Sequence, residues 1–499
     1  MPLTIQNSLT RKKEEFKTLT DGHVGMYVCG PTVSGESHLG HARPFITFDI
    51  VYRYLLHLGY KVRYVRNITD AGHFEEEGRE AEDKISKKAV LEKLEPMELV
   101  QKYTNLFHWA MREFNNIEPS IEPTATGHIV EQINMIEKIM EEGYAYESKG
   151  SVYFDVKKYA ASNDYGKLSG RVMEDLLETT RDLDGQDDKR NKADFALWKA
   201  APPEHIMRWK SPWGEGFPGW HIECSAMATK YLGSQFDIHG GGMDLMFPHH
   251  ESEIAQSTVC NHHTPATYWM HNNMITIAGK KMGKSYNNVI KLTELFSGNH
   301  PLLTQAFHPM VVRFFILQTH YRSTLDFSSE ALVAAEKGLK RLWDAYEVLK
   351  KLPSVNRRQT TDESQNKELE AQCLKLVDEL DDFMNDDFNT AKVLANIFEL
   401  VPVINGLKDG HIAPHSITAE ILQLLQTSLK TWLEDILGLK STRETNPALN
   451  SVMELLIDIR KEARANKDFS TSDKIRNRLS DAGVLLKDEK DGNITWEIN

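Results

Sequence analysis

The spacing of hydrophobic and polar residues predicts alternating strands and helices in the first part of the chain. Residues 26–33 (MYVCGPTV) have the pattern of a strand that ends in a Gly-Pro turn. Residues 38–58 carry apolar side chains at helical spacing, and residues 61–68 (KVRYVRNI) follow as a second strand. This order predicts the βαβ unit of a doubly wound parallel sheet, whose ligands bind at the carboxyl ends of the strands. Residues 30–41 are expected at that edge.

The pattern is mixed over the next part of the chain. Strand-like SVYFDV is followed by the charged stretch DLDGQDDKRNK, which is typical of an exposed loop. We therefore expect residues 122–210 to form an insertion in the α/β domain. Strand-like residues 235–238 and 267–277 flank the helical pattern of residues 251–260, which indicates that the α/β sheet resumes there.

Long amphipathic helices replace this pattern after Ser328 and predict a helical bundle. They are expected over residues 331–351, 367–384, 390–407 and 418–437. A polar link (STRETNPALN) precedes a last compact unit, with two helices and the strand-like end ITWEIN. The predicted domains are an α/β domain over 1–327 with its insertion, a helical bundle over 328–440, and a small C-terminal unit over 449–499.

Composition narrows the class of protein. The chain has 499 residues, 40% of them hydrophobic, which is typical of an ordered globular protein with several cores. It has no run of about 18 apolar residues, and its first residues lack the apolar centre of a signal peptide. We therefore expect a cytoplasmic protein without a membrane partner. Four widely spaced cysteines in a reducing compartment argue against disulfides, so a metal, nucleophilic or packing role is expected for each.

The formal net charge of −13 argues against broad electrostatic binding to nucleic acid. A nucleic-acid partner would have to be bound by local basic patches. Residues 460–478 form one candidate, because they carry seven Lys or Arg against three acidic residues, a local charge of +4. The alternative is a solvated helix face.

Two short motifs suggest phosphate chemistry. His38-Leu39-Gly40-His41 lies where the first helix begins, and free backbone N–H groups and the helix dipole favour anions there. Gly40 leaves room for a nucleotide, although two surface histidines near a helix cap would give the same pattern. The loop KKMGKS carries Lys281 and Lys284, and nucleotidyl transfer needs such mobile cations. Alone it would be a solvated turn, but the combination with the first motif is specific.

A third set of residues has the donor atoms of a zinc site. Cys29, Cys224, His249 and Glu253 offer S, S, N and O ligands that suit a tetrahedral ion. His249 and Glu253 are four residues apart, as on one helical face. The set is scattered along the sequence, so that buried structural cysteines remain an alternative on spacing alone.

These features together resemble the cysteinyl-tRNA synthetases, a family of class I aminoacyl-tRNA synthetases. The stretches that carry the resemblance are LTRKKEEF, MYVCGPTV, RNITD, PGWHIECSAM, FDIHGGGMDLMFPHHESEIAQS, YWMHNNM, HYRSTLDF and NDDFNTAKVL. They cover nearly the whole chain. The resemblance implies a Rossmann-like catalytic domain with an insertion, followed by an α-helical bundle and a small C-terminal domain. The bundle would lie on the anticodon-stem side of the tRNA, and the C-terminal unit would bind the anticodon.

The resemblance also implies a reaction and its partners. L-Cysteine would be activated with ATP to cysteinyl-adenylate and transferred to the 3′ end of tRNA(Cys), giving AMP and pyrophosphate. One Zn²⁺ per chain would be bound by Cys29, Cys224, His249 and Glu253, and Mg²⁺ would accompany ATP. A soft thiolate binds zinc far better than a serine hydroxyl does, so no editing site would be needed. A cytoplasmic monomer is expected.

The remaining site residues also follow from the resemblance. Those expected to contact ATP are His38, Gly40, His41, Lys281 and Lys284, and both histidines and both lysines are expected to be catalytic. Those expected to contact the substrate cysteine are Thr69, Trp220 and Asp244, with Asp244 near the ammonium group.

The sequence departs from the family pattern at a few positions. Gly283 stands where the mobile loop usually has serine, Ser34 and Gly35 replace the usual Tyr-Asp, and Phe217 replaces a common basic residue. Two alternatives are a cysteine ligase of the mycothiol pathway, which uses an amino sugar, and a non-catalytic tRNA-binding scaffold. The long helical region after Ser328 favours the tRNA enzyme over the first, and the intact motifs and zinc ligands argue against the second.

Overall fold

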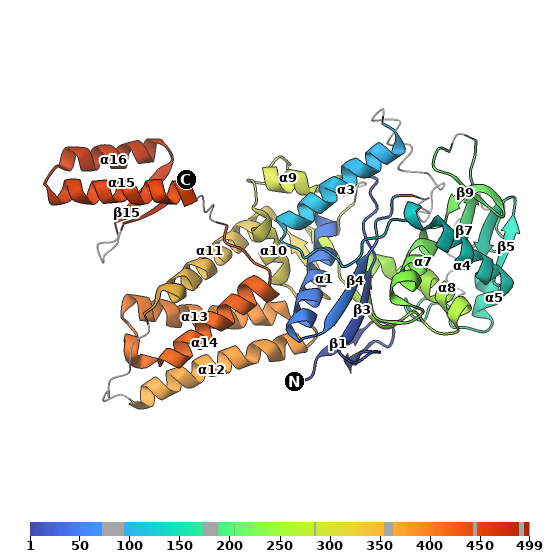
Figure 1. Ribbon diagram of the computed structural model, residues 1–499, viewed down its shortest axis with the longest axis horizontal. Helices are drawn as coiled ribbons and strands as arrows, with labels where there is room; N and C mark the ends of the chain where they lie inside the picture. Colours follow the sequence, from blue (N-terminus) through green and yellow to red (C-terminus); the bar gives the residue numbers. More distant parts are fainter. Residues whose placement is uncertain are drawn as a thin grey trace. The chain divides into compact units, whose positions relative to one another are not determined.

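The computed structural model forms two compact units, residues 1–440 and 441–499 (Figure 1). It describes residues 1–71, 94–172, 188–203, 205–283, 286–353, 363–442, 447–488 and 494–498. The first unit contains the α/β domain, its insertion and the helical bundle, and the second contains the C-terminal helices and hairpin.

A four-stranded parallel sheet is the centre of the first unit. Its strand order is β11 (Ala266–Asn272), β10 (Phe236–Gly242), β3 (His23–Val28) and β4 (Lys61–Arg66), and all neighbours are parallel. Helix α1 (Leu39–His57) connects β3 to β4 and confirms the predicted βαβ unit. Every residue of β10 is buried, because helices cover both faces of such a sheet.

Close packing between α1 and the sheet depends on a glycine in β10. A Cβ atom on Gly240 would lie 2.3 Å from the ring of Phe48, which α1 places on this face. The glycine therefore allows α1 to approach the strand. This approach fixes the start of α1 beside the carboxyl end of β3.

The insertion contains a five-stranded antiparallel sheet and has a hydrophobic core of its own. In sheet order its strands are β5 (Ala145–Ser148), β6 (Ser151–Phe154), β7 (Phe195–Ala200), β9 (Gly214–Pro218) and β8 (Trp209–Ser211). Helices α4 (Ile129–Glu141), α7 (Trp220–Leu232) and α8 (Glu251–Asn261) pack together beside it (Figure 1). The sheet continues beyond residue 210. Of the charged stretch at 182–192, residues 182–187 lie outside the described residues.

A small sheet carries the second phosphate motif. β12 (Ile275–Ile277) pairs with β13 (Lys280–Lys281) on one side and with β14 (Leu325–Phe327) on the other. Asp326 on β14 accepts hydrogen bonds from the hydroxyl of Thr276, at 2.6 Å, and from the backbone N–H of Gly279, at 2.8 Å. These bonds support the turn that leads into the basic loop.

Four long helices form the predicted bundle. They are α11 (Ser329–Lys351), α12 (Glu363–Asn385), α13 (Thr390–Asp409) and α14 (Ala419–Lys430). α13 is long and apolar enough to cross a membrane, but 61% of its apolar window is buried and it packs against α11 and α12. Its composition is therefore explained by its place in the core of the bundle.

The second unit consists of two helices and a hairpin. Helices α15 (Pro447–Ala465) and α16 (Phe469–Asp481) lie side by side, and β15 (Val484–Asp488) pairs antiparallel with β16 (Ile494–Ile498). A small hydrophobic core joins the two layers through α15 and β15. This arrangement agrees with the two helices and the strand expected there.

A buried arginine of the α/β domain joins that domain to the bundle. Arg313, on α10 (Pro309–Leu317), is completely buried and binds the carboxylate of Asp49 on α1 at 2.5 Å. The same guanidinium donates to the carbonyl oxygens of Leu437 and Phe114, at 2.8 and 2.9 Å. One side chain thus links α1, the end of α3 (Pro96–Glu113) and the end of the bundle.

Replacing Arg313 is expected to destabilise the first unit strongly. Arg313→Ala removes one of the two cations that contact the buried carboxylate of Asp49, since Arg53 remains at 2.8 Å, and it leaves two buried carbonyl oxygens without their donor. The expected cost is about 3 kcal/mol. The measurement is urea denaturation followed by tryptophan fluorescence. The matched control is Arg112→Ala, which breaks an exposed pair with Glu118 and is expected to cost at most about 1 kcal/mol. Equal effects of the two substitutions would contradict the role assigned to Arg313.

Candidate active site

Four residues from distant parts of the chain meet in one buried cluster. Cys29 follows β3, Cys224 lies on α7, His249 lies in the helical turn Met246–His250, and Glu253 lies on α8. One donor atom from each lies within 4.8 Å of all the others, and all four side chains are buried. The structure therefore brings together the four residues that the sequence proposed as metal ligands.

The separations between donor atoms suit a tetrahedral metal ion. The Cys29 and Cys224 sulfurs are 3.7 Å apart, and Cys29 Sγ is 3.6 Å from Glu253 Oε1. His249 Nε2 lies 3.4 Å from Cys224 Sγ and 3.1 Å from Glu253 Oε1. Metal–ligand bonds of about 2.0–2.3 Å around zinc place ligand atoms about 3.4–3.8 Å apart. The cluster fits such an ion after only small shifts.

The charges of the cluster also call for a cation. Burial raises the pKa of Cys224, but a hydrogen bond with Cys29 and the charge of His249 lower it to about 6. Burial likewise raises the pKa of Glu253, yet His239 and His249 lower it to about 2. Burial lowers the pKa of His249, but Cys224 and Glu253 raise it to about 10. Two buried anions thus depend on one positive charge, which a divalent ion can supply in place of the proton.

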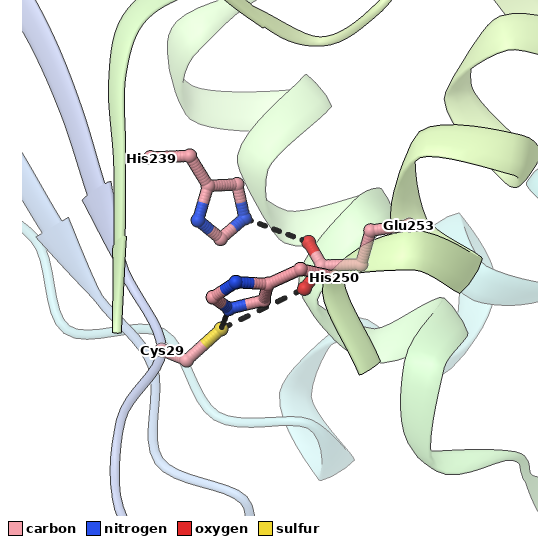
Figure 2. Close-up of side chains that lie close together, drawn as sticks. All are labelled: Cys29, His239, His250 and Glu253. Atoms are coloured by element: carbon pink, nitrogen blue, oxygen red, sulfur yellow. Dashed lines mark hydrogen bonds and ion pairs between the residues drawn. The ribbon is translucent and has the colours of Figure 1, made fainter. Parts of the chain in front are cut away.

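Two further histidines lie against this cluster and were not identified from the sequence. His239 Nε2 is 2.9 Å from Glu253 Oε2, and His250 Nε2 is 3.2 Å from Cys29 Sγ (Figure 2). With Cys29 and Glu253 they form a second group that could bind a metal. His239 contacts the second carboxylate oxygen, Oε2, whereas Oε1 faces Cys29 and His249, and both contacts have the lengths of hydrogen bonds. We therefore interpret both histidines as groups that orient the ligands.

The residues proposed for the substrate cysteine divide into two sets. Trp220 packs against His249, with 4.5 Å between ring centroids. The hydroxyl of Thr69 donates to Glu223 at 3.1 Å and accepts from Asn67 at 3.0 Å, and Asn67 Oδ1 is 3.7 Å from Cys224 Sγ. These two residues are thus connected to the cluster.

Asp244 is in a different environment. It is exposed in the short helix Met243–Leu245, and its carboxylate covers the backbone of Gly242. The buried carboxylate beside Thr69 is instead Glu223, which the sequence reasoning passed over. Its signal was an acidic residue directly before the proposed metal ligand Cys224.

The His38-Leu39-Gly40-His41 motif forms the cap of α1. His38 Nδ1 accepts from the N–H of Gly40 at 3.1 Å, and His41 Nδ1 accepts from the N–H of His38 at 3.2 Å. The rings are stacked, with 3.9 Å between centroids. Because both Nδ1 atoms accept, each neutral ring carries its proton on Nε2 and can donate it to an anionic oxygen. Burial and the charge of His38 lower the pKa of His41 to about 3, so His41 is neutral at pH 7.

The backbone amides of this first turn were expected to be free to bind an anion, but they are already hydrogen-bonded within the protein. The N–H of Leu39 donates to Ile290 O at 2.9 Å, that of His41 to His38 O at 2.8 Å, and that of Gly40 to the His38 ring. The imidazoles and the basic loop are therefore the donors that remain for phosphate.

Backbone pairing brings the two phosphate motifs together. Residues 37–39 pair with residues 290–292, because Leu39 N donates to Ile290 O and Leu292 N donates to Ser37 O, each at 2.9 Å. A Cβ atom on Gly40 would lie 4.0 Å from the sulfur of Met282, so the basic loop approaches the glycine. Lys281 is exposed on β13, and Lys284 lies outside the described residues.

Comparison with protein families identifies two domains. The family described as "tRNA synthetases class I (C) catalytic domain" matches residues 15–337, and the DALR domain matches residues 379–441. The chain is 58% identical over 502 residues to a protein of Bacteroides thetaiotaomicron named cysteine–tRNA ligase, covering 100% of this chain and 99% of the relative. A cysteine–tRNA ligase of Porphyromonas gingivalis is 55% identical over 502 residues, with the same coverage.

Solved structures share the fold at low sequence identity. The LeuRS–tRNA–LeuAMS ternary complex of Agrobacterium radiobacter matches with a TM-score of 0.58 at 12% identity, covering 84% of this chain and 85% of that one. Methionyl-tRNA synthetase of Mycobacterium tuberculosis in complex with methionyl-adenylate matches with a TM-score of 0.56 at 12% identity, covering 83% and 92%. These matches confirm the predicted fold class.

The cluster is expected to lose its metal when one sulfur ligand is removed. Cys224→Ser replaces a soft donor by a hydroxyl, so zinc bound after dialysis should fall from about one per chain to nearly none. The readouts are zinc content and the charge-transfer absorption of the cobalt-substituted protein. Cys260→Ser is the matched control, because Cys260 is a buried thiol outside the cluster on the same helix as Glu253. Unchanged zinc in Cys224→Ser would refute the ligand assignment.

Proposed function

The chain belongs to the cysteine–tRNA ligases, which are class I aminoacyl-tRNA synthetases, and we propose that its buried Cys29–Cys224–His249–Glu253 cluster binds one Zn²⁺ and selects the substrate by its thiol. As a cysteine–tRNA ligase it joins cysteine to tRNA(Cys) at the expense of ATP. The observation that carries the metal proposal is the convergence of four buried donor atoms within 4.8 Å.

Thiol selection follows from the donor set. When bound, Zn²⁺ supplies a soft Lewis acid that prefers a thiolate to a hydroxyl and lowers the pKa of a coordinating thiol. His239 and His250 orient Glu253 and Cys29, so that the ligands are in place before the substrate arrives. Serine lacks the soft donor and is disfavoured without an editing site.

The pocket for the rest of the amino acid is proposed beside the cluster. Trp220 forms one wall against His249, and the Thr69 hydroxyl lies on the side of Cys224. The exposed carboxylate of Asp244 is proposed to attract the substrate ammonium at the entrance. These groups orient the substrate carboxylate toward the nucleotide.

ATP is proposed to bind at the paired motifs. His38 and His41 donate from Nε2 to phosphate oxygens, Gly40 leaves room for the nucleotide, and Lys281 and Lys284 balance the charge of the leaving pyrophosphate. The carboxylate oxygen of cysteine forms a bond to the α-phosphorus as the bond to the β-phosphate oxygen breaks. The nucleophile is already an anion, so catalysis rests on positioning and charge, with Mg²⁺ proposed as the partner of ATP.

tRNA recognition is assigned to the rest of the chain. We propose that the bundle over 328–440 contacts the anticodon stem and that the unit over 449–499 binds the anticodon. Within residues 460–478, Arg460 is buried, so it supports its own unit. The exposed basic residues are Lys461, Arg464, Lys467, Lys474, Arg476 and Arg478. We further propose a cytoplasmic monomer, as for the family.

Alignment along the full length separates this proposal from the earlier alternatives. The cysteine–tRNA ligases match over 99% of their own length, and the DALR domain lies in the helical region that an amino-sugar ligase would not need. A non-catalytic scaffold would need neither the cluster nor the paired phosphate motifs.

The amino-acid specificity of ATP–pyrophosphate exchange tests the proposed site. Exchange should proceed with cysteine and be lower with serine by about 10³-fold or more, because serine leaves a metal position poorly filled. Protein stripped of zinc by a chelator should lose exchange and regain it when zinc is returned. His38→Ala is the control for the nucleotide half, since it should reduce exchange at unchanged zinc content. Full activity in the stripped protein would refute the metal proposal while leaving the family assignment intact.

A further inference from the structure

Asn288 is a buried residue whose side chain binds the basic loop at two points. Only 8% of it is exposed. Its Oδ1 accepts a hydrogen bond from the backbone N–H of Gly283 at 2.9 Å, and its Nδ2 donates to the carbonyl oxygen of Lys281 at 3.2 Å. One carboxamide therefore fixes the backbone on both sides of Met282.

The segment that begins at Asn288 is bonded at its other end to the first phosphate motif. Ile290 and Leu292 pair with the backbone at residues 37–39. One residue further on, the hydroxyl of Thr293 donates to the carboxylate of Glu36 at 2.7 Å. Residues 288–293 thus form a connecting segment between the loop that carries Lys281 and the turn that carries His38.

We propose that Asn288 is a positioning residue for adenylate formation, because its carboxamide sets the place of Lys281 relative to His38 and His41. The inference rests on the proposed role of these residues in binding the phosphates of ATP. Asn288 does not itself touch the reacting atoms. It acts through the backbone of the loop and through the connecting segment of residues 288–293.

The chemistry of the loop explains why such a residue is needed. Lys281 is an exposed, flexible side chain, so its backbone must be fixed if its charge is to meet the leaving pyrophosphate. Gly283 has no side chain, so its backbone has additional freedom. Asparagine offers one acceptor and one donor at the spacing of the two backbone groups, whereas aspartate offers acceptors only.

The role is specific to one step of the reaction. Charge builds up on the pyrophosphate only while the adenylate forms, and a lysine of this loop stabilises that charge. Transfer of cysteine from the finished adenylate to the tRNA involves no pyrophosphate. Loss of the Asn288 bonds should therefore slow the first step and leave the second unchanged.

The test uses the full-length protein and measures the two steps separately. Asn288→Ala should lower the maximal rate of cysteine-dependent ATP–pyrophosphate exchange by about 10- to 100-fold, the loss that two hydrogen bonds or a shift of about 1 Å can cause. Single-turnover transfer from preformed cysteinyl-adenylate to tRNA should stay within about twofold of the wild type. The KM for cysteine and the zinc content should not change, and the melting temperature should fall by no more than a few degrees.

Asn288→Asp and Asn287→Gly complete the series. Asn288→Asp keeps the acceptor for Gly283 but loses the donor to Lys281, so its exchange rate should fall between those of the wild type and Asn288→Ala. Asn287 is the exposed neighbour, with a φ of 50° that glycine adopts readily, so Asn287→Gly should behave as the wild type. If Asn288→Ala does not fold, the same comparison of steps in Asn288→Asp decides.

Two outcomes would overturn the inference. One is an exchange rate of Asn288→Ala within twofold of the wild type. The other is a parallel fall of exchange and transfer with a lower melting temperature, which would mean that Asn288 only stabilises the fold. Failure of the proposed function looks different, because the wild-type protein itself would then show no cysteine-dependent exchange.

Discussion

The burial of two negative charges beside one thiol is the constraint on which the rest of the site depends. Cys224 and Glu253 are anionic at neutral pH and have no access to solvent, so positive charge and hydrogen-bond donors must surround them. Glu253 divides its two oxygens between these tasks: Oε1 faces Cys29 and His249, while Oε2 is bound by His239. Strand β10 and helix α8 must therefore keep their places relative to one another. The parallel sheet and the close packing of α1 on Gly240 make this possible.

Much of the fold could be predicted from local patterns, because each element carries its own periodicity. The strand, helix and strand at residues 26–68 were evident from apolar spacing, and so were the helices of the bundle. The end of the antiparallel insertion was less evident, since β8 has only three residues and β9 (GEGFP) contains two glycines and a proline, which are rare in strands. Their pairing is set by contacts distant in sequence, which no local pattern records.

The site shows a similar division between what residue types reveal and what only the fold reveals. The four metal ligands were proposed from their donor atoms, which are two sulfurs, an imidazole nitrogen and a carboxylate oxygen. The fold brings those four residues together. His239 was missed because it lies in a buried glycine-rich strand, where a histidine is expected to be a packed core residue. The bonded first-turn amides of α1 could not be foreseen either. Their acceptors include Ile290, about 250 residues away in sequence, and the side chain of His38, whose rotamer the sequence does not specify.

The short segment after β3 explains how thiol selection and phosphate chemistry can work on one substrate. It carries Cys29 at one end and His38 at the other, so one stretch of backbone sets the distance between the thiol site and the phosphate site. A Cβ atom on Gly30 would lie 1.5 Å from the carbonyl oxygen of Asn67, and the N–H of Gly30 donates to the Asn67 side chain at 2.8 Å. The segment is thus fixed immediately after the metal ligand. A substrate anchored by its sulfur then presents its carboxylate at a set distance from the α-phosphate, which is the condition for direct attack by an anion that needs no general base.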